Sequence, residues 1–137
     1  MTVIASFYSE VSQLVDAELD RLLPAAEVEP TRLHEAMRWS VFAGGKRFRP
    51  ALAIAVGRAF GVSDDRLSSI SAAIEMIHTF SLIHDDLPAM DDDNMRRGKE
   101  TCHVKYDEAT AILAGDALQT LAFKTIAEDE KLPVVIR

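Results

Sequence analysis

Residues 64–98 read DDRLSSISAAIEMIHTFSLIHDDLPAMDDDNMRRG, an apolar-rich run that ends in closely spaced aspartates and two arginines. Its first part is rich in Ile, Leu, Ala and Ser, which predicts one long helix over about residues 64–89. Pro88 has no backbone N–H to donate, so we expect it to kink or end this helix. The distortion is expected to bring Asp85 and Asp91 toward one cavity.

Helices are also expected before and after this run. Apolar residues at spacings of three and four predict a helix that begins near Phe7 and ends at Pro24. Further helices are expected from Thr31, as N-cap, to Gly44, from Pro50 to Phe60, and over residues 106–129. The last of these is expected to carry a wide apolar stripe that includes Ile112 and Leu113. No run alternates apolar and polar residues over the length of a strand. The chain is therefore predicted to be all-α, a helical bundle in which residues 1–137 form a single domain.

The composition excludes several classes of function. The formal net charge is −7, so neither non-specific binding to nucleic acid nor docking on anionic lipid is expected, because both need a basic surface. Cys102 is the only cysteine, so no intramolecular disulfide is possible. We recognise neither a secretory signal nor an apolar stretch of about 20 residues, the length that crosses a bilayer. We expect a cytoplasmic protein with no nucleic-acid or membrane partner.

The five aspartates between residues 85 and 93 form a candidate metal site. Carboxylates this close repel one another unless a cation or water screens them. Mg²⁺ keeps several of its waters, binds carboxylate oxygens and bridges to substrate phosphates. Arg96 and Arg97 follow at once and supply positive charge for the same anion. The segment is therefore predicted to bind magnesium and a phosphate-bearing substrate.

Other interpretations of the aspartates are less favoured. A solvated acidic helix end is the simplest alternative. An EF-hand is excluded, because the sixth position from Asp91 is Arg96 rather than glycine and the twelfth is Cys102 rather than glutamate. His84 precedes the aspartates, as in HD-type phosphohydrolases, but that family needs a metal-binding histidine farther upstream than His78.

A basic segment, Gly-Gly-Lys-Arg-Phe-Arg-Pro at residues 44–50, lies between two predicted helices. Paired glycines let a backbone approach a ligand, and three cations in four residues can hold a diphosphate. It is not a P-loop, because GxxxxGK[ST] is absent. Taken alone, the segment is more typical of a surface turn with solvated basic residues than of a ligand site.

The long helix carries further polar residues. Residues at i, i+3 and i+7 share a helix face, so His78, Ser81 and Asp85 are expected to line up. His78 could bind an anion there or be a hydrogen-bonded core histidine. Glu75 and Asp116 lie inside apolar helices, and we expect each to have a buried partner or to face a cavity.

Four segments in this order resemble the trans-isoprenyl diphosphate synthase family, and most closely its bacterial farnesyl diphosphate synthases. They are the basic segment at 44–50, IHTFSLIHDDLPAMD at 77–91, Arg-Arg-Gly at 96–98 and LAGDALQ at 113–119. The resemblance implies the first half of an all-helical isoprenoid synthase fold. It also implies a magnesium-dependent prenyltransferase that condenses isopentenyl diphosphate with dimethylallyl or geranyl diphosphate.

The resemblance assigns roles residue by residue. The metal ligands would be Asp85, Asp86 and Asp91, which would hold magnesium on the diphosphate of the allylic substrate. Arg96 would contact that same diphosphate. The residues implied to hold the diphosphate of isopentenyl diphosphate are Lys46, Arg49, His78 and Arg97.

Product length is set in this family below the first aspartate motif. Phe80 occupies the fifth position before Asp85, and Ser81 the fourth. An aromatic residue there resembles enzymes that stop at fifteen carbons, which gives farnesyl diphosphate. Pro88 and Ala89, inserted within the motif, also occur in geranylgeranyl diphosphate synthases, so that activity remains an alternative.

The family has a second aspartate-rich motif, DDxxD, which is absent from this chain. After Asp93 no two aspartates are adjacent. The chain is thus expected to supply about half of the family's bundle and one wall of its cavity. A non-catalytic half-bundle that binds diphosphate or pairs with another subunit is therefore a second hypothesis. The helix over residues 106–129 is the candidate interface of a homodimer.

Overall fold

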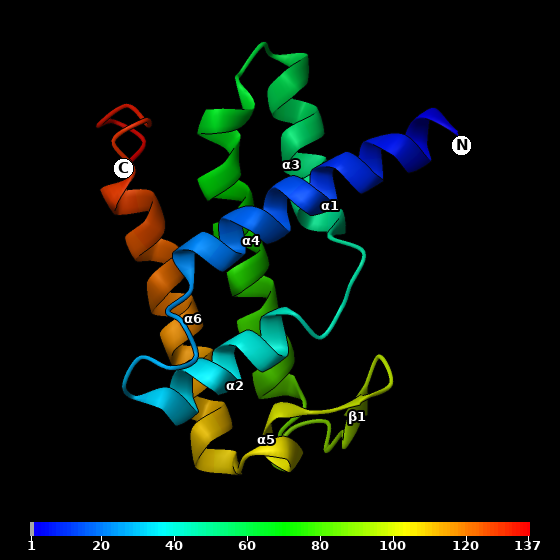
Figure 1. Cartoon of the computed structure of the whole chain (residues 1–137), viewed down its shortest axis with the longest axis vertical. Coiled ribbons are helices and arrows are strands. Elements are labelled where there is room, and N and C mark those ends of the chain that lie inside the picture. The colour runs from blue at the N-terminus through cyan, green and yellow to red at the C-terminus, as the bar shows by residue number, and fades with distance from the viewer. Residues whose placement is uncertain (1) are drawn as a thin grey trace. The chain divides into compact units, whose positions relative to one another are not determined.

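The structure is a computed structural model that describes residues 2–137 (Figure 1). Its contacts divide the chain into two compact units. The first contains the residues up to Leu22, Lys46–Glu75 and Ala122–Arg137, and the second contains Leu23–Gly45 and Met76–Leu121. No helix within residues 2–137 has both the length and the apolar character needed to cross a membrane.

Six helices form within the described residues, and the all-α prediction is confirmed. They are α1 (Val3–Leu22), α2 (Thr31–Val41), α3 (Phe48–Ala59), α4 (Asp64–Asp85), α5 (Cys102–Lys105) and α6 (Glu108–Glu128). Helices α4 and α6 each contribute residues to both units. The only strands within residues 2–137 are β1 (Met95–Arg96) and β2 (Lys99–Glu100).

In the first unit, α1 packs against α3 (Figure 1). Val11, Val15 and Leu19 lie four residues apart on α1, so they share one face, and all three are fully buried. Ile54 of α3 is buried as well. The apolar periodicity of the first predicted helix therefore identified its packing face correctly.

The turn after α3 closes a helical hairpin with the first residues of α4. Gly61 has a φ of +73°, a conformation that glycine adopts at low cost. The N–H of Gly61 donates to the carbonyl of Arg58, and the N–H of Val62 donates to that of Gly57. This pair of bonds is a Schellman motif, and it ends the helix at the glycine that the sequence indicated.

In the second unit, α2 contacts α5. The prediction that Thr31 is the N-cap of α2 is wrong, because Thr31 is already helical and Pro30 occupies the cap position. Pro30 has no polar side chain to offer. The N–H of Thr31 instead donates to the Glu29 carboxylate at 3.1 Å, which satisfies one of the unpaired donors at the helix start.

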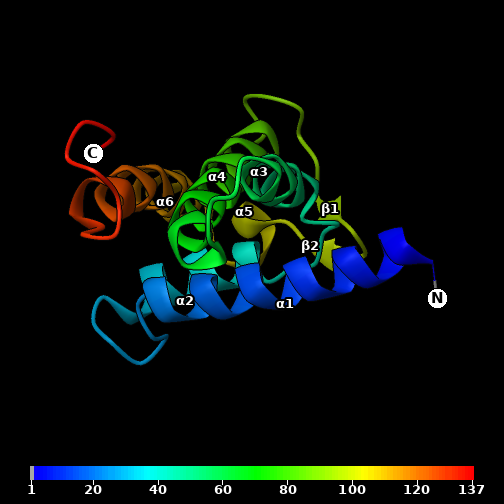
Figure 2. The ribbon, with the colours of Figure 1, turned by 90° about the horizontal axis from the view of Figure 1, so that it is seen from above.

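The long helix ends earlier than predicted. Helix α4 stops at Asp85, three residues before Pro88, and a loop leads into a short hairpin (Figure 2). In the hairpin Met95 pairs with Glu100 and Arg96 with Lys99. The two turn residues, Arg97 and Gly98, have φ of +53° and +78°, as in the two-residue turns that suit the strand twist. Strands of two residues have no detectable periodicity, so the sequence could not reveal them.

The last helix also differs from the prediction. It begins at Glu108 rather than near Tyr106, because the carboxylate of Asp107 accepts a hydrogen bond from the N–H of Thr110 at 2.7 Å and caps it. Its buried face also differs. Ile112 and Leu113, which were expected on the apolar stripe, are 43% and 57% exposed. The buried residues within α6 are Ala111, Ala114, Leu118, Ala122 and Thr125, with Gly115 beside them.

Gly115 leaves space for the ring of His84, whose Nε2 lies 3.0 Å from the carbonyl oxygen of Ile112. A Cβ at Gly115 would lie 2.6 Å from Cδ2 of that ring. Overpacking costs about 1–3 kcal/mol, whereas alanine favours a helix over glycine by about 1 kcal/mol. We therefore expect Gly115→Ala to lower the free energy of unfolding in urea by about 1 kcal/mol. In a His84→Ala background the same substitution should raise it, and a loss in both backgrounds would contradict the steric explanation.

Asp107 makes the stability of this unit depend on acid pH. The N–H of Thr110 and the guanidinium of Arg32 lower the pKa of Asp107 from 3.8 to about 2. A carboxylate with a lowered folded-state pKa stabilises the fold above its ordinary pKa and loses that effect as the pH falls toward 2. Asp107→Asn keeps the cap but removes the charge. Between pH 4 and 2, the free energy of unfolding measured with urea should therefore fall more steeply for the original chain than for the variant. Equal slopes would refute this assignment.

Candidate diphosphate and metal site

The end of α4 and the hairpin after it are joined by a buried carboxylate. Asp86 is 3% exposed and accepts hydrogen bonds from two nitrogens of Arg96, from Nη2 at 2.6 Å and from Nε at 2.9 and 3.1 Å. The planar guanidinium matches the two carboxylate oxygens, which makes this a strong ion pair. The hydrogen bond to Asp86 raises the pKa of Arg96 above its usual range. Two residues with separately predicted roles thus contact each other.

The loop after α4 folds back onto the helix end. The N–H of Asp91 donates to the carbonyl of Asp85 at 2.8 Å, and the N–H of Asp93 donates to the carbonyl of Asp86 at 3.2 Å. The backbones of Asp85 and Asp91 are therefore adjacent, although six residues separate them. The change of direction before Pro88 produces the approach that the sequence predicted for these two backbones.

The carboxylates of Asp85 and Asp91 are available for a ligand. Asp85 is half-buried and Asp91 is exposed, and within residues 2–137 neither side chain makes a hydrogen bond or ion pair. Residues 2–137 contain no group of three His, Cys, Asp or Glu side chains arranged so that they could hold a metal ion. Mg²⁺ commonly uses only one or two carboxylates and completes its shell with water and substrate phosphate. These two hard oxygen donors fit that ion.

Arg97 lies against the paired glycines. Its Nη1 donates to the carbonyl of Gly44, and a Cβ at Gly45 would come within 3.0 Å of the Arg97 Cζ. Gly45 also has a φ of +144°, which side-chain-bearing residues rarely adopt. Glycine is therefore needed here so that the guanidinium can approach the backbone. The carbonyl is neutral, so the charge of Arg97 is not cancelled by this contact.

The predicted face of α4 is present in the structure. His78, Ser81 and Asp85 all lie within the regular helix, and the hydroxyl of Ser81 donates to the carbonyl of His78 at 2.8 Å. Phe80 lies edge-on to the ring of His84, with 4.8 Å between ring centroids. The two positions implied to control product length are half-buried.

The basic segment divides into buried and exposed cations. Lys46 and Arg49 are exposed, whereas the Arg47 side chain is only 4% exposed. Arg47 Nη1 donates to Glu75 at 2.9 Å, and its Nη2 lies 2.8 Å from Asp16. The hypothesis of a fully solvated basic turn is therefore wrong for Arg47.

The sequence predicted that Glu75 and Asp116, which lie inside apolar helices, each have a buried partner or face a cavity. Glu75 has the buried partner that was expected, although the sequence did not identify it as Arg47. Asp116 is 59% exposed, and its Oδ1 lies 3.9 Å from Nε2 of His84. The expectation of a buried partner or cavity is thus wrong for Asp116, because its side of α6 faces outward.

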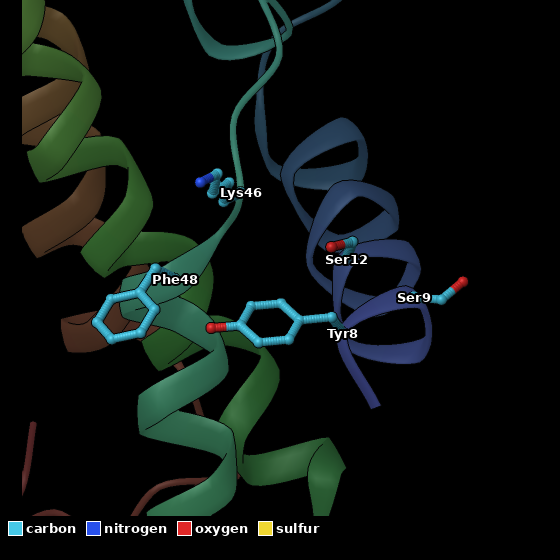
Figure 3. A pocket seen from close by; sticks show the side chains of 5 residues that line it. All are labelled: Tyr8, Ser9, Ser12, Lys46 and Phe48. Atoms are coloured by element: carbon cyan, nitrogen blue, oxygen red, sulfur yellow. The ribbon is translucent and has the colours of Figure 1, made fainter. Parts of the chain in front are cut away.

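A pocket of about 580 Å³ lies in the first unit (Figure 3). Its lining residues are Tyr8, Ser9, Ser12, Lys46 and Phe48. Tyr8 reaches from α1 toward Phe48 at the start of α3, and Lys46 lies on the segment just before it (Figure 3). The sequence indicated Lys46 alone, because Tyr8 and Ser12 belong to an ordinary amphipathic helix.

Comparison with known proteins identifies this combination of segments. Residues 30–137 match the polyprenyl synthetase family model. Farnesyl diphosphate synthase of Haemophilus influenzae is 49% identical over 93% of this chain and 47% of its own length. A chloroplastic geranylgeranyl pyrophosphate synthase of Catharanthus roseus is 52% identical over 75% of this chain and 29% of its own length.

Solved structures agree with the sequence comparison. The geranyltransferase of Legionella pneumophila superposes with a TM-score of 0.90 at 40% identity, over 96% of this chain and 47% of that protein. The chain therefore spans about half the length of the Haemophilus influenzae and Legionella pneumophila proteins. The resemblance seen in the four segments is confirmed, and the chain belongs to the polyprenyl synthetase family.

Proposed function

We propose that this chain takes part in magnesium-dependent prenyl transfer, in which isopentenyl diphosphate condenses with dimethylallyl or geranyl diphosphate to give farnesyl diphosphate. The observation that carries the proposal is the return of Asp91 onto Asp85, in a family member whose relatives include farnesyl diphosphate synthases. That turn brings together the backbones of two residues whose carboxylates are unpaired, just before the hairpin that carries Arg96 and Arg97.

The allylic diphosphate is the group that must leave. Its C–O bond breaks with the electron pair going to the diphosphate, so negative charge grows on the phosphate oxygens. Arg96 would contact these oxygens through its guanidinium, which stays charged at all relevant pH values. Asp85 and Asp91, with Asp86, would hold magnesium. When bound, the ion would neutralise part of the charge on the leaving group.

The second substrate supplies the new bond. The π electrons of the isopentenyl double bond attack the allylic cation, and loss of a proton from the resulting cation restores an alkene. The released diphosphate is a suitable base for that proton. The charged end of isopentenyl diphosphate would be held by Lys46, Arg49, His78 and Arg97. Because the isopentenyl double bond is itself the nucleophile, no protein nucleophile is required.

Phe80 and Ser81 would limit the growing prenyl chain. The aromatic ring of Phe80 supports a product of fifteen carbons. The 52% identity to the Catharanthus roseus geranylgeranyl pyrophosphate synthase favours a second candidate, a product of twenty carbons. We further propose that the protein works in the cytoplasm as a homodimer paired through the region of α6.

Product analysis tests the proposed function. The purified chain is incubated with labelled isopentenyl diphosphate, geranyl diphosphate and magnesium, and the products are separated by chain length. A C15 product supports farnesyl diphosphate synthesis and a C20 product the second candidate. Binding without product would identify a non-catalytic half-bundle that binds diphosphate or pairs with another subunit. Absence of magnesium-dependent binding would contradict the proposal altogether.

Asp85 is expected to be needed for binding through magnesium. In calorimetric titration with geranyl diphosphate and magnesium, Asp85→Asn should weaken binding about tenfold, as expected for the loss of one charged ligand. Asp93→Asn removes the same charge from the loop that follows α4 and should change affinity less than about twofold. With magnesium chelated, the difference between the variants should disappear. Equal effects of the two variants in magnesium would remove Asp85 from the metal site.

A further inference from the structure

Arg47 is the buried member of the basic segment. Its side chain and that of Glu75 are each 4% exposed, and Nη1 donates to the Glu75 carboxylate at 2.9 Å. Two further nitrogens, Nε and Nη2, are 2.8 Å from Asp16 on α1. The guanidinium is thus directed inward and bound to carboxylates of α1 and α4.

The backbone at Arg47 has an unusual conformation. Its φ of 48° and ψ of 36° lie in the left-handed region, which residues other than glycine seldom adopt. Such a conformation persists where the surroundings hold it in place. Arg47 is also the N-cap of α3, and its carbonyl accepts the N–H of Ala51 at 2.9 Å. The buried ion pair is thus made by the residue at which the chain turns into α3.

The neighbours of Arg47 point elsewhere. Lys46 and Phe48, on either side of it, line the pocket beside Tyr8 (Figure 3). Within the described residues the Lys46 ammonium makes no hydrogen bond or ion pair. Arg49, two residues beyond Arg47, is exposed. A fixed backbone at Arg47 thus constrains the backbone from which the side chains of Lys46 and Arg49 extend toward a diphosphate.

We infer that Arg47 is a positioning residue, which holds Lys46 and Arg49 in their diphosphate-binding places through its buried pair with Glu75. The inference rests on the proposed function, because that function gives Lys46 and Arg49 their ligand. Arg47 itself would not contact the ligand, since its guanidinium is occupied by two carboxylates.

The direction in which Glu75→Gln changes the affinity for an anion distinguishes a positioning role from a purely electrostatic one. Glu75→Gln removes a negative charge from the unit that carries Lys46. Electrostatics alone would then strengthen the binding of an anion. Loss of positioning would weaken it, because Arg47 would lose its buried charged partner and the turn one of its two anchors. Asp16 still pairs with Arg47 in this variant, which favours retention of the fold.

The test is calorimetric titration of the whole chain with isopentenyl diphosphate. Lys46→Ala identifies binding at this site and should weaken it about tenfold, as for loss of one charged contact. Glu75→Gln should also weaken it about tenfold, because a small displacement of binding groups has effects of that size. Glu10→Gln is the matched control, because Glu10 pairs with Arg58 rather than Arg47. It should leave affinity within about twofold.

Two further measurements separate a local effect from unfolding. Hydrogen exchange at the Ala51 amide should speed up in Glu75→Gln, while the melting temperature shows whether the chain is folded. If Glu75→Gln does not fold, Arg47→Lys replaces it. This variant keeps the charge but loses the fork that joins Glu75 to Asp16, and it should weaken binding similarly.

The outcomes are distinct. Weaker binding in Glu75→Gln or Arg47→Lys, with a folded chain and faster Ala51 exchange, supports the positioning role. Unchanged or tighter binding in a folded variant overturns the inference and leaves the proposed function intact. If the original chain does not bind isopentenyl diphosphate, or if Lys46→Ala has no effect, the proposed role of Lys46 fails and the positioning role fails with it.

Discussion

A buried guanidinium requires counter-charges, and Arg47 obtains them from two helices, one from a buried carboxylate and one from a half-exposed carboxylate. Asp16 on α1 and Glu75 on α4 hold it at the N-terminus of α3, so one side chain connects three helices of the first unit. Removing one partner of such a pair costs about 3–5 kcal/mol, because a charge is left buried. The left-handed conformation of Arg47 itself costs roughly 1–2 kcal/mol. The pair thus lies at a residue whose backbone is unfavourable, where the basic segment turns sharply into α3.

The second unit also contains an arginine paired with a buried carboxylate, but this arginine is partly exposed. Asp86 is buried, but the Arg96 side chain that binds it is 31% exposed. Arg47 is almost wholly buried, whereas Arg96 is partly exposed and pairs with Asp86 through Nε and Nη2 only. A diphosphate could therefore interact with Arg96 without breaking the contact that orders the hairpin. This difference separates an arginine that only organises the fold from one suited to the proposed leaving-group role.

The sequence predicted the elements that depend on local pattern. Helix positions followed from apolar spacing and from Gly61, and the aspartate segment followed from its charge density. Features that depend on tertiary contacts were missed. The hairpin around Arg97 is too short for periodicity, and the true face of α6 is set by small residues such as Ala111 and Ala114 that a search for large apolar side chains overlooks. The partnership of Arg47 with Glu75 spans 28 positions, and nothing in a single sequence pairs one arginine with one glutamate.

These contacts also explain how a chain with a net charge of −7 can be suited to an anionic ligand. Arg47, Arg58 and Arg96 are each paired with carboxylates, so their charge is cancelled close to its source. Two other cations, Arg97 and Lys46, have no carboxylate partner within the described residues. Arg97 donates to a neutral carbonyl, and Lys46 makes no ion pair within the described residues. Because water and salt screen exposed charges beyond about 8–10 Å, a diphosphate responds to such local uncompensated cations more than to the net charge. Which cations lack a carboxylate partner is therefore a better guide to the anion site than the number of cations in the segment.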